Sequence, residues 1–170
     1  ASRGIIKLRF DRNSVSKNDF DIFIDKIDEI FSDDILAYEN ISVEKALGSL
    51  LAKNDIKVSF VESITGGLLS SLLVKNPGIS KYFIGSDIVY GNQAKSILLN
   101  DNDIDFENWE ELCVNLTHSS LEKYKTDICL TILGEAGPLS SSKYSVGTIF
   151  ICISNGDKTV ITDHKMNGNR

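Results

Sequence analysis

A chain of 170 residues, with 42% hydrophobic and 25% charged side chains, is long enough to bury one ordinary hydrophobic core. Its net charge of −6 at pH 7 argues against a nucleic-acid partner, because such proteins present a basic face. No apolar run approaches the roughly 18 residues that span a bilayer, so we expect no membrane partner either.

The three cysteines, Cys113, Cys129 and Cys152, lie far apart and each stands among apolar residues. Their spacing matches neither a disulfide framework nor a zinc site. We therefore expect three reduced core cysteines, no metal and no cofactor, in a cytoplasmic protein. His118 and His164 have no partner nearby in the sequence and are interpreted as surface or satisfied core histidines.

Residues 1–40 predict a small strand–helix–strand fragment. The segment 5–10 is rich in apolar residues and predicts a strand, and apolar residues at helical spacing over 20–31 predict a helix. The short apolar segment 35–38 predicts the second strand. We expect this fragment to belong to a preceding module, joined to a main domain at 41–170.

The main domain alternates helical and strand patterns, which predicts an α/β fold. Helices are expected at 43–51, 68–74, 92–99 and 109–120, and strands at 56–61, 82–90, 128–133, 146–153 and 159–164. The segment 56–61 has the apolar bias of a strand buried on both faces by helices. A turn through 155–157 predicts a hairpin between the last two strands. We therefore predict a three-layer α/β/α sandwich with a mixed, mostly parallel sheet.

The segment 62–67, Glu-Ser-Ile-Thr-Gly-Gly, is a polar turn between a buried strand and a helix. A helix N-terminus offers unpaired backbone N–H groups and a partial positive charge, which suit a phosphate or an oxyanion. The glycines would let the backbone approach a ligand closely. The alternative is structural: Ser63 or Thr65 caps the helix, and the glycines only shape the turn.

The segment 90–95, Tyr-Gly-Asn-Gln-Ala-Lys, is a second junction between a strand and a helix. Two such junctions of one sheet can face each other across a crevice, which would place Lys95 near Ser63. A desolvated lysine has a lowered pKa and can act as a general base toward a serine. The alternative is an ordinary solvated lysine.

A third polar segment leaves the strand at 128–133. It consists of Gly-Glu-Ala-Gly-Pro at 134–138 and a stretch at 139–143 that is rich in serine. This composition is typical of a flexible loop that closes over a ligand, or alternatively of an ordinary surface loop.

Together these segments resemble the C-terminal domain of the CinA (competence-damage) family. The family pattern contains Glu-Ser-Cys-Thr-Gly-Gly, Pro-Gly-Ser, Tyr-Ser-Asn-Glu-Ala-Lys, Thr-Gly-Ile-Ala-Gly-Pro, Pro-Val-Gly-Thr and Gly-Asp-Arg. Counterparts stand in the same order at 62–67, 77–80, 90–95, 134–138, 145–148 and 168–170. The agreement covers about residues 42–170. Residues 1–40 resemble the small linking module that precedes this domain in longer CinA proteins and are interpreted as its remnant.

The resemblance implies an amidase that converts nicotinamide mononucleotide to nicotinate mononucleotide and ammonia without a metal. It implies Ser63 as the nucleophile, Lys95 as its base, and Tyr90 as a group that positions or polarises the substrate. Contacts to this small nucleotide are implied for Glu62, Thr65, Gly66, Gly67, Asn92, Gly137 and Arg170. The N–H groups of 65–67 would receive the oxyanion or the phosphate, and Arg170 would bind the phosphate or support the site. A homo-oligomer is compatible with the sequence.

The chain departs from the family pattern at the third segment. The family's catalytic threonine falls on Leu133, which has no hydroxyl, and the glycine-rich loop is replaced by Leu139 and three serines. The missing hydroxyl could come instead from Thr131, Ser140, Ser141 or Ser142. The alternative function is therefore a catalytically degenerate CinA-like domain that binds a nucleotide or has a regulatory or assembly role.

Overall fold

The computed structural model describes residue 6, residues 12–140 and residues 142–167. The chain divides into two compact units, residues 1–46 and residues 47–170. The first unit contains helix α1 (Lys17–Phe31), between short 3-10 turns η1 (Arg12–Ser14) and η2 (Ser32–Asp34). Helix α2 (Val43–Asn54) begins in the first unit and ends in the second.

Helix α1 confirms the helix expected over 20–31, and it begins at a capping residue. The Ser16 hydroxyl accepts a hydrogen bond from the Asp19 N–H at 3.1 Å. The strand predicted at 35–38 is wrong, because these residues pair with no strand in the described part of the chain. Tyr38 instead donates its hydroxyl to the carboxylate of Asp28 on α1, at 2.6 Å. Apart from Ile6, which is not in a strand, the segment 5–10 lies outside the described residues.

The second unit is built on a five-stranded sheet of order β2-β1-β3-β4-β5. The strands are β1 (Val58–Glu62), β2 (Phe83–Ile88), β3 (Ile128–Gly134), β4 (Thr148–Ser154) and β5 (Thr159–Lys165). β1 pairs in parallel with β2 and β3, whereas β4 pairs antiparallel with β3 and β5. Among the described strands only β4 runs against the others, which confirms the mixed, mostly parallel sheet and the final hairpin.

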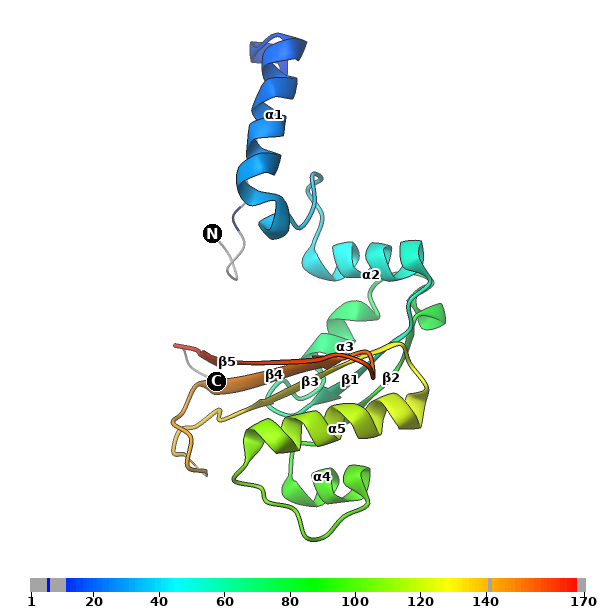
Figure 1. Cartoon of the computed structure of the whole chain (residues 1–170), viewed down its shortest axis with the longest axis vertical. Coiled ribbons are helices and arrows are strands. Elements are labelled where there is room, and N and C mark those ends of the chain that lie inside the picture. The colour runs from blue at the N-terminus through cyan, green and yellow to red at the C-terminus, as the bar shows by residue number, and fades with distance from the viewer. Residues whose placement is uncertain (1–5, 7–11, 141, 168–170) are drawn as a thin grey trace. The chain divides into compact units, whose positions relative to one another are not determined.

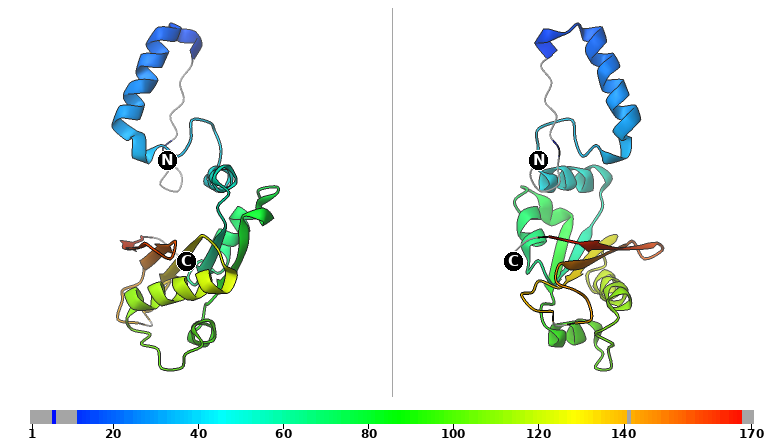
Figure 2. Two further views of the ribbon diagram at one scale, coloured as in Figure 1. Left: turned by 45° about the vertical axis from the view of Figure 1, so that its right-hand side comes forward. Right: turned by 90° about the vertical axis from the view of Figure 1, so that its left-hand side faces the viewer.

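Helices cover both faces of this sheet (Figure 1). α3 (Leu68–Leu73) lies on one face and α5 (Trp109–Tyr124) on the other. α4 (Asn92–Leu99) packs against α5, and a 3-10 turn, η3 (Ile79–Lys81), precedes β2. The two further views show α3 and α5 on opposite faces (Figure 2). Neighbouring side chains of β1 divide between two cores: Phe60 packs with Leu73 of α3, and Val61 packs with Leu116 of α5. All residues of β1 are buried, so the predicted three-layer α/β/α sandwich is confirmed.

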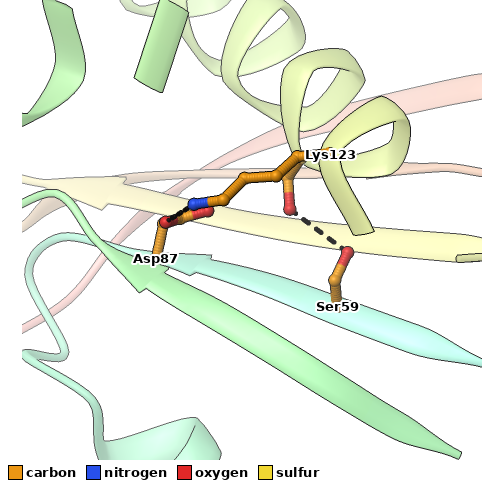
Figure 3. Close-up of polar contacts among 4 residues, drawn as sticks. Ser59, Asp87 and Lys123 are labelled. Atoms are coloured by element: carbon orange, nitrogen blue, oxygen red, sulfur yellow. Dashed lines mark hydrogen bonds and ion pairs between the residues drawn. The ribbon is translucent and has the colours of Figure 1, made fainter. Parts of the chain in front are cut away.

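Polar contacts fasten α5 to the sheet (Figure 3). Lys123 of α5 forms an ion pair with Asp87 of β2, with 2.5 Å between Nζ and Oδ1. The buried Ser120 hydroxyl of α5 donates to the buried Ser59 hydroxyl of β1 at 3.2 Å. Because buried hydroxyls need hydrogen-bond partners, these contacts fix the position of α5 along the sheet, and with it the position of Trp109 at its first turn.

The cysteines and histidines occupy the predicted environments. Cys113, Cys129 and Cys152 are free thiols that are fully buried in the core. Burial raises the pKa of the Cys129 thiol, which keeps it protonated. His118 and His164 are exposed, and each ring lies 3.1 Å from a threonine hydroxyl. None of the helices in the described part of the chain is long and apolar enough to cross a membrane.

Candidate active site

A cavity of about 380 Å³ lies where the chain leaves the carboxyl ends of β1, β2 and β3. After β1 the chain crosses to β2, on one side, and after β3 it continues to β4, on the other. Such a switch point in strand order is where open α/β sheets bind ligands. All three predicted segments contribute to the cavity wall, with Ser63, Ile64, Tyr90, Gly91, Asn92, Lys95, Leu133, Gly134, Glu135, Ala136 and Gly137.

Ser63 is held at the end of β1 by the sheet itself. Its backbone N–H donates to the Ile132 carbonyl of β3 at 3.0 Å, which continues the parallel pairing one residue beyond the strand. The side chain is 6% exposed, and its hydroxyl forms no hydrogen bond with another described residue. The neighbouring Ile64 packs so closely on Gly134 that a Cβ there would lie 2.7 Å from its Cδ1. The Ser63 hydroxyl is therefore available to a ligand on a firmly held turn.

Lys95 lies on the first turns of α4 and is buried in the same cavity wall. Its amine donates to Asn92 Oδ1 at 3.1 Å. Burial lowers the pKa of Lys95, because a poorly hydrated site disfavours the charged form. Asn92 therefore orients an amine that gives up its proton more readily than an exposed lysine does.

Glu62 anchors the first turn of α3. Its fully buried carboxylate accepts hydrogen bonds from the backbone N–H groups of Leu69 and Ser70, both at 2.9 Å, and from the Ser70 hydroxyl. Burial alone would raise the pKa of Glu62, but these hydrogen bonds outweigh it and lower the pKa. The N–H groups of Leu69 and Ser70 in the first turn of α3 are thus occupied by the protein's own anion, whereas binding of a phosphate or oxyanion by the N–H groups of 65–67 stays a prediction.

Thr65, Gly66 and Gly67 also lie outside the cavity wall. The Gly66 N–H donates to the Ser63 carbonyl at 3.1 Å, which closes a tight turn. This N–H group is therefore already used within the chain. Gly66 and Gly67 have φ angles of +58° and +99°, in the left-handed region that favours glycine. These glycines therefore shape the turn that presents Ser63, and their contact with a substrate stays a prediction.

The apolar side chain of Leu133 forms part of the cavity wall where the CinA pattern has a threonine. It is 2% exposed and packs in the core on the α5 side of the sheet. Thr131 does not replace the missing hydroxyl, because it is fully buried outside the cavity wall and accepts a hydrogen bond from the Thr117 hydroxyl at 2.7 Å. The site thus lacks a hydroxyl at the family position.

Of the candidate hydroxyls that the structure describes, Ser142 alone lines the cavity. Ser140 donates to backbone carbonyls of its own loop, and Ser141 lies outside the described residues. The Ser142 hydroxyl donates to Glu135 Oε2 at 3.2 Å and accepts from the Tyr144 N–H at 3.2 Å. Sequence reasoning gave Glu135 no role, although a charged residue directly after a buried strand was a usable signal.

Trp109, which lines the cavity, and the aromatic cluster that supports it were also missed. Trp109 stacks against Tyr144, with 4.5 Å between ring centroids, and Tyr144 meets Phe150 edge to face at 5.2 Å. Glu107, which also lines the cavity, accepts a hydrogen bond from the Lys143 N–H at 3.1 Å. These contacts hold the loop after β3 against the beginning of α5. The only tryptophan in the chain was a signal for this wall.

The remaining predicted residues differ in their placement. Tyr90 lines the cavity and is 56% exposed, so it forms part of the rim. Gly137 also lines it, with φ +72°, and a Cβ there would lie 2.7 Å from a methyl group of Val146. Arg170 lies outside the described residues. In the described part of the chain, no group of three or more His, Cys, Asp or Glu side chains is placed to hold a metal ion.

Similarity to known proteins covers most of this chain. The family model described as CinA C-terminal domain matches residues 40–170. The chain belongs to the CinA C-terminal domain family. A CinA-like protein of Pseudothermotoga lettingae is 37% identical over 134 residues, which are 76% of this chain and 33% of that protein. A CinA-like protein of Fervidobacterium nodosum is 28% identical over 170 residues, 97% of this chain and 42% of its own length.

Solved structures of CinA superfamily proteins share the fold of this CinA domain. The protein from Enterobacter cloacae has a TM-score of 0.69 at 22% identity, over 78% of this chain and 85% of its own. The protein from Escherichia coli has a TM-score of 0.66 at 19% identity, over 74% and 76%. The chain spans about a third to two fifths of the length of the two curated relatives above.

The geometry of this CinA domain suits nucleophilic chemistry. A serine hydroxyl is a weak nucleophile until a base takes its proton, and a desolvated lysine is such a base. Ser63 and Lys95 line one cavity, with Asn92 orienting the amine. Glu135 and Ser142 add hydrogen-bond acceptors, and Trp109 and Tyr90 add aromatic surface for a flat ring.

Proposed function

We propose that this CinA domain hydrolyses the carboxamide of nicotinamide mononucleotide to nicotinate mononucleotide and ammonia. The observation that carries the proposal is a single cavity lined by the available hydroxyl of Ser63 and by the buried, pKa-lowered amine of Lys95. The choice of nicotinamide mononucleotide as the substrate rests on the resemblance of segments 62–67 and 90–95 to the CinA pattern. The aromatic wall around Trp109 is consistent with a pyridine ring.

In the proposed reaction, Lys95 accepts the Ser63 proton while Oγ bonds to the carboxamide carbon. The tetrahedral intermediate collapses as the C–N bond breaks, and Lys95 gives the proton to the departing ammonia. A water molecule, deprotonated by Lys95, then attacks the resulting acyl ester. The bond between the acyl carbon and Oγ then breaks, and Lys95 returns the proton that it took from water to Oγ, which releases the acid product and restores Ser63. Tyr90, on the rim, is placed to position the substrate.

Ammonia release from nicotinamide mononucleotide tests this function. We expect turnover by the wild type and a loss of at least about 10³-fold in Ser63→Ala, as for other catalytic serines. Ser140→Ala is the matched control, because this loop hydroxyl bonds only to backbone groups of its own loop in the described chain. Equal turnover by Ser63→Ala and Ser140→Ala would contradict the assignment of the nucleophile.

A second candidate function rests on Leu133. Its apolar side chain lines the cavity where the family pattern has a hydroxyl, as in a catalytically degenerate domain that binds a nucleotide without turning it over. Binding of nicotinamide mononucleotide by the wild type, with no ammonia released, would favour this second function.

A further inference from the structure

Glu135 places a buried carboxylate in the cavity where the CinA pattern has isoleucine. The residue is 7% exposed and lines the wall directly after β3. Its N–H donates to the Thr148 carbonyl at 3.0 Å, and its carbonyl accepts from the Gly147 N–H at 2.7 Å. Because both backbone groups are bonded to the chain entering β4, the carboxylate projects from a rigid point. A rigid polar group in a cavity wall is suited to ligand discrimination.

The neighbouring Ser142 strengthens the acceptor character of this wall. Its hydroxyl has one proton, which it donates to Glu135 Oε2 at 3.2 Å, and it already accepts from the Tyr144 N–H. A carboxylate offers about four lone-pair positions and can accept from several donors at once, the Ser142 hydroxyl among them. Glu135 and Ser142 therefore present hydrogen-bond acceptors to a ligand in the cavity.

A primary carboxamide and the corresponding acid differ in the group that such a wall would meet. The amide has an NH₂ group with two donors, whereas the ionised acid has a second oxygen that can only accept and carries negative charge. An acceptor wall therefore binds the amide and repels the acid, and discrimination of this kind is strong because the wrong ligand leaves buried polar groups unpaired.

We propose that Glu135, with Ser142, accepts the N–H groups of the substrate's carboxamide and makes the cavity selective for the amide over its acid product. This inference rests on the proposed function, since it takes the cavity as the amidase site. It also gives Glu135 a part in product release. Once the amide has become a carboxylate, the new charge lies beside the charge of Glu135, and the product is expelled.

The fluorescence of Trp109 can be used to measure ligand binding. This residue is the only tryptophan in the chain and lines the cavity, so its fluorescence reports ligand binding. Nicotinamide mononucleotide and nicotinate mononucleotide are titrated separately into Ser63→Ala, so that no turnover occurs during the measurement. We expect the amide to bind at least about tenfold more tightly than the acid, the factor that corresponds to about 1.4 kcal/mol.

Adding Glu135→Gln should reduce this amide preference by about tenfold or more, mainly because the acid binds more tightly once the repelling charge is gone. Glu107→Gln is the matched control. Glu107 is a second carboxylate on the same cavity wall, but it is exposed and is held by the Lys143 N–H. We expect this control to change the preference by less than about threefold, because solvent screens exposed charges.

An unchanged preference in Glu135→Gln, or an equal shift in Glu107→Gln, would overturn the proposal, as would failure of both ligands to bind. If Glu135→Gln loses its native circular dichroism spectrum, Ser142→Ala replaces it and should reduce the preference in the same direction. The binding preference is measured without turnover. A wild type that releases no ammonia but prefers the amide would therefore refute the amidase and leave the role of Glu135 supported.

Discussion

Replacing Glu62 by glutamine removes the anion that holds the N-terminus of α3 beside Ser63. The wild-type carboxylate accepts two backbone N–H groups and the Ser70 hydroxyl in a fully buried position. Glutamine keeps the shape but turns one acceptor oxygen into a donor, so at least one of these buried donors loses its partner. A hydrogen bond to a charged group contributes about 1.5–3 kcal/mol, and we expect a loss of about 2 kcal/mol in unfolding free energy.

The loss should depend on pH in a defined direction. Because the pKa of Glu62 is lowered in the fold, its stabilisation is fully present above the unfolded value of about 4.3. It is lost as the pH falls through the lower folded value. The difference in unfolding free energy between wild type and Glu62→Gln should therefore be constant near neutral pH and should shrink below pH of about 4.3.

Urea unfolding, followed by circular dichroism at a series of pH values, measures this difference. With a typical dependence on urea, 2 kcal/mol corresponds to a midpoint lower by about 1 M. Glu122→Gln, on the exposed face of α5, is the control and should lie within about 0.5 kcal/mol of wild type. The explanation is refuted if Glu62→Gln unfolds at the wild-type midpoint at pH 7, or if its deficit persists unchanged in acid.

Three further predictions concern the cavity and its support. Leu133→Thr should raise ammonia release by about 10²-fold if the missing hydroxyl limits turnover; family-like turnover by wild type, without a gain in the variant, would count against this. Lys95→Met should abolish turnover yet stabilise the fold at pH 7. Its gain in unfolding free energy should vanish as the pH rises through the unfolded lysine pKa of about 10.4, because burial lowers the folded pKa; a gain independent of pH contradicts this. Gly147→Ala should destabilise the fold by more than about 2 kcal/mol in urea, since φ is +88° and the added Cβ would meet the Met166 carbonyl oxygen at 2.3 Å; a midpoint equal to wild type would show that the turn relaxes.

The sequence was sufficient to predict the layers of the second unit, because its periodic patterns are set by burial. The apolar bias of 56–61 predicted a strand covered on both faces, and β1 is buried along its whole length. The segment 35–38 is equally apolar, but a strand also requires a partner, and composition does not show whether one is present.

The candidate site could be predicted only where a residue's role follows from the element it stands on. Ser63 and Lys95 follow neighbouring parallel strands, so topology alone brings them to one edge of the sheet. The role of Glu62 depends on which side of the turn its carboxylate faces. The sequence of a helix N-terminus does not show whether its N–H groups bind a ligand or a glutamate of the same chain. Trp109 and Glu135 come to line the same cavity through tertiary packing, which no local pattern encodes.

The strand order has a consequence for how the domain folds. β1 lies between β2 and β3, and its pairing with β3 joins residues about 70 positions apart, as the hydrogen bond from the Lys57 N–H to Asp127 illustrates. Closing so long a loop is entropically costly and slow compared with forming local helices. The cavity draws on the ends of all three strands, so it takes shape only after this late pairing. A growing chain therefore has no complete cavity until β3 has been synthesised and has docked beside β1.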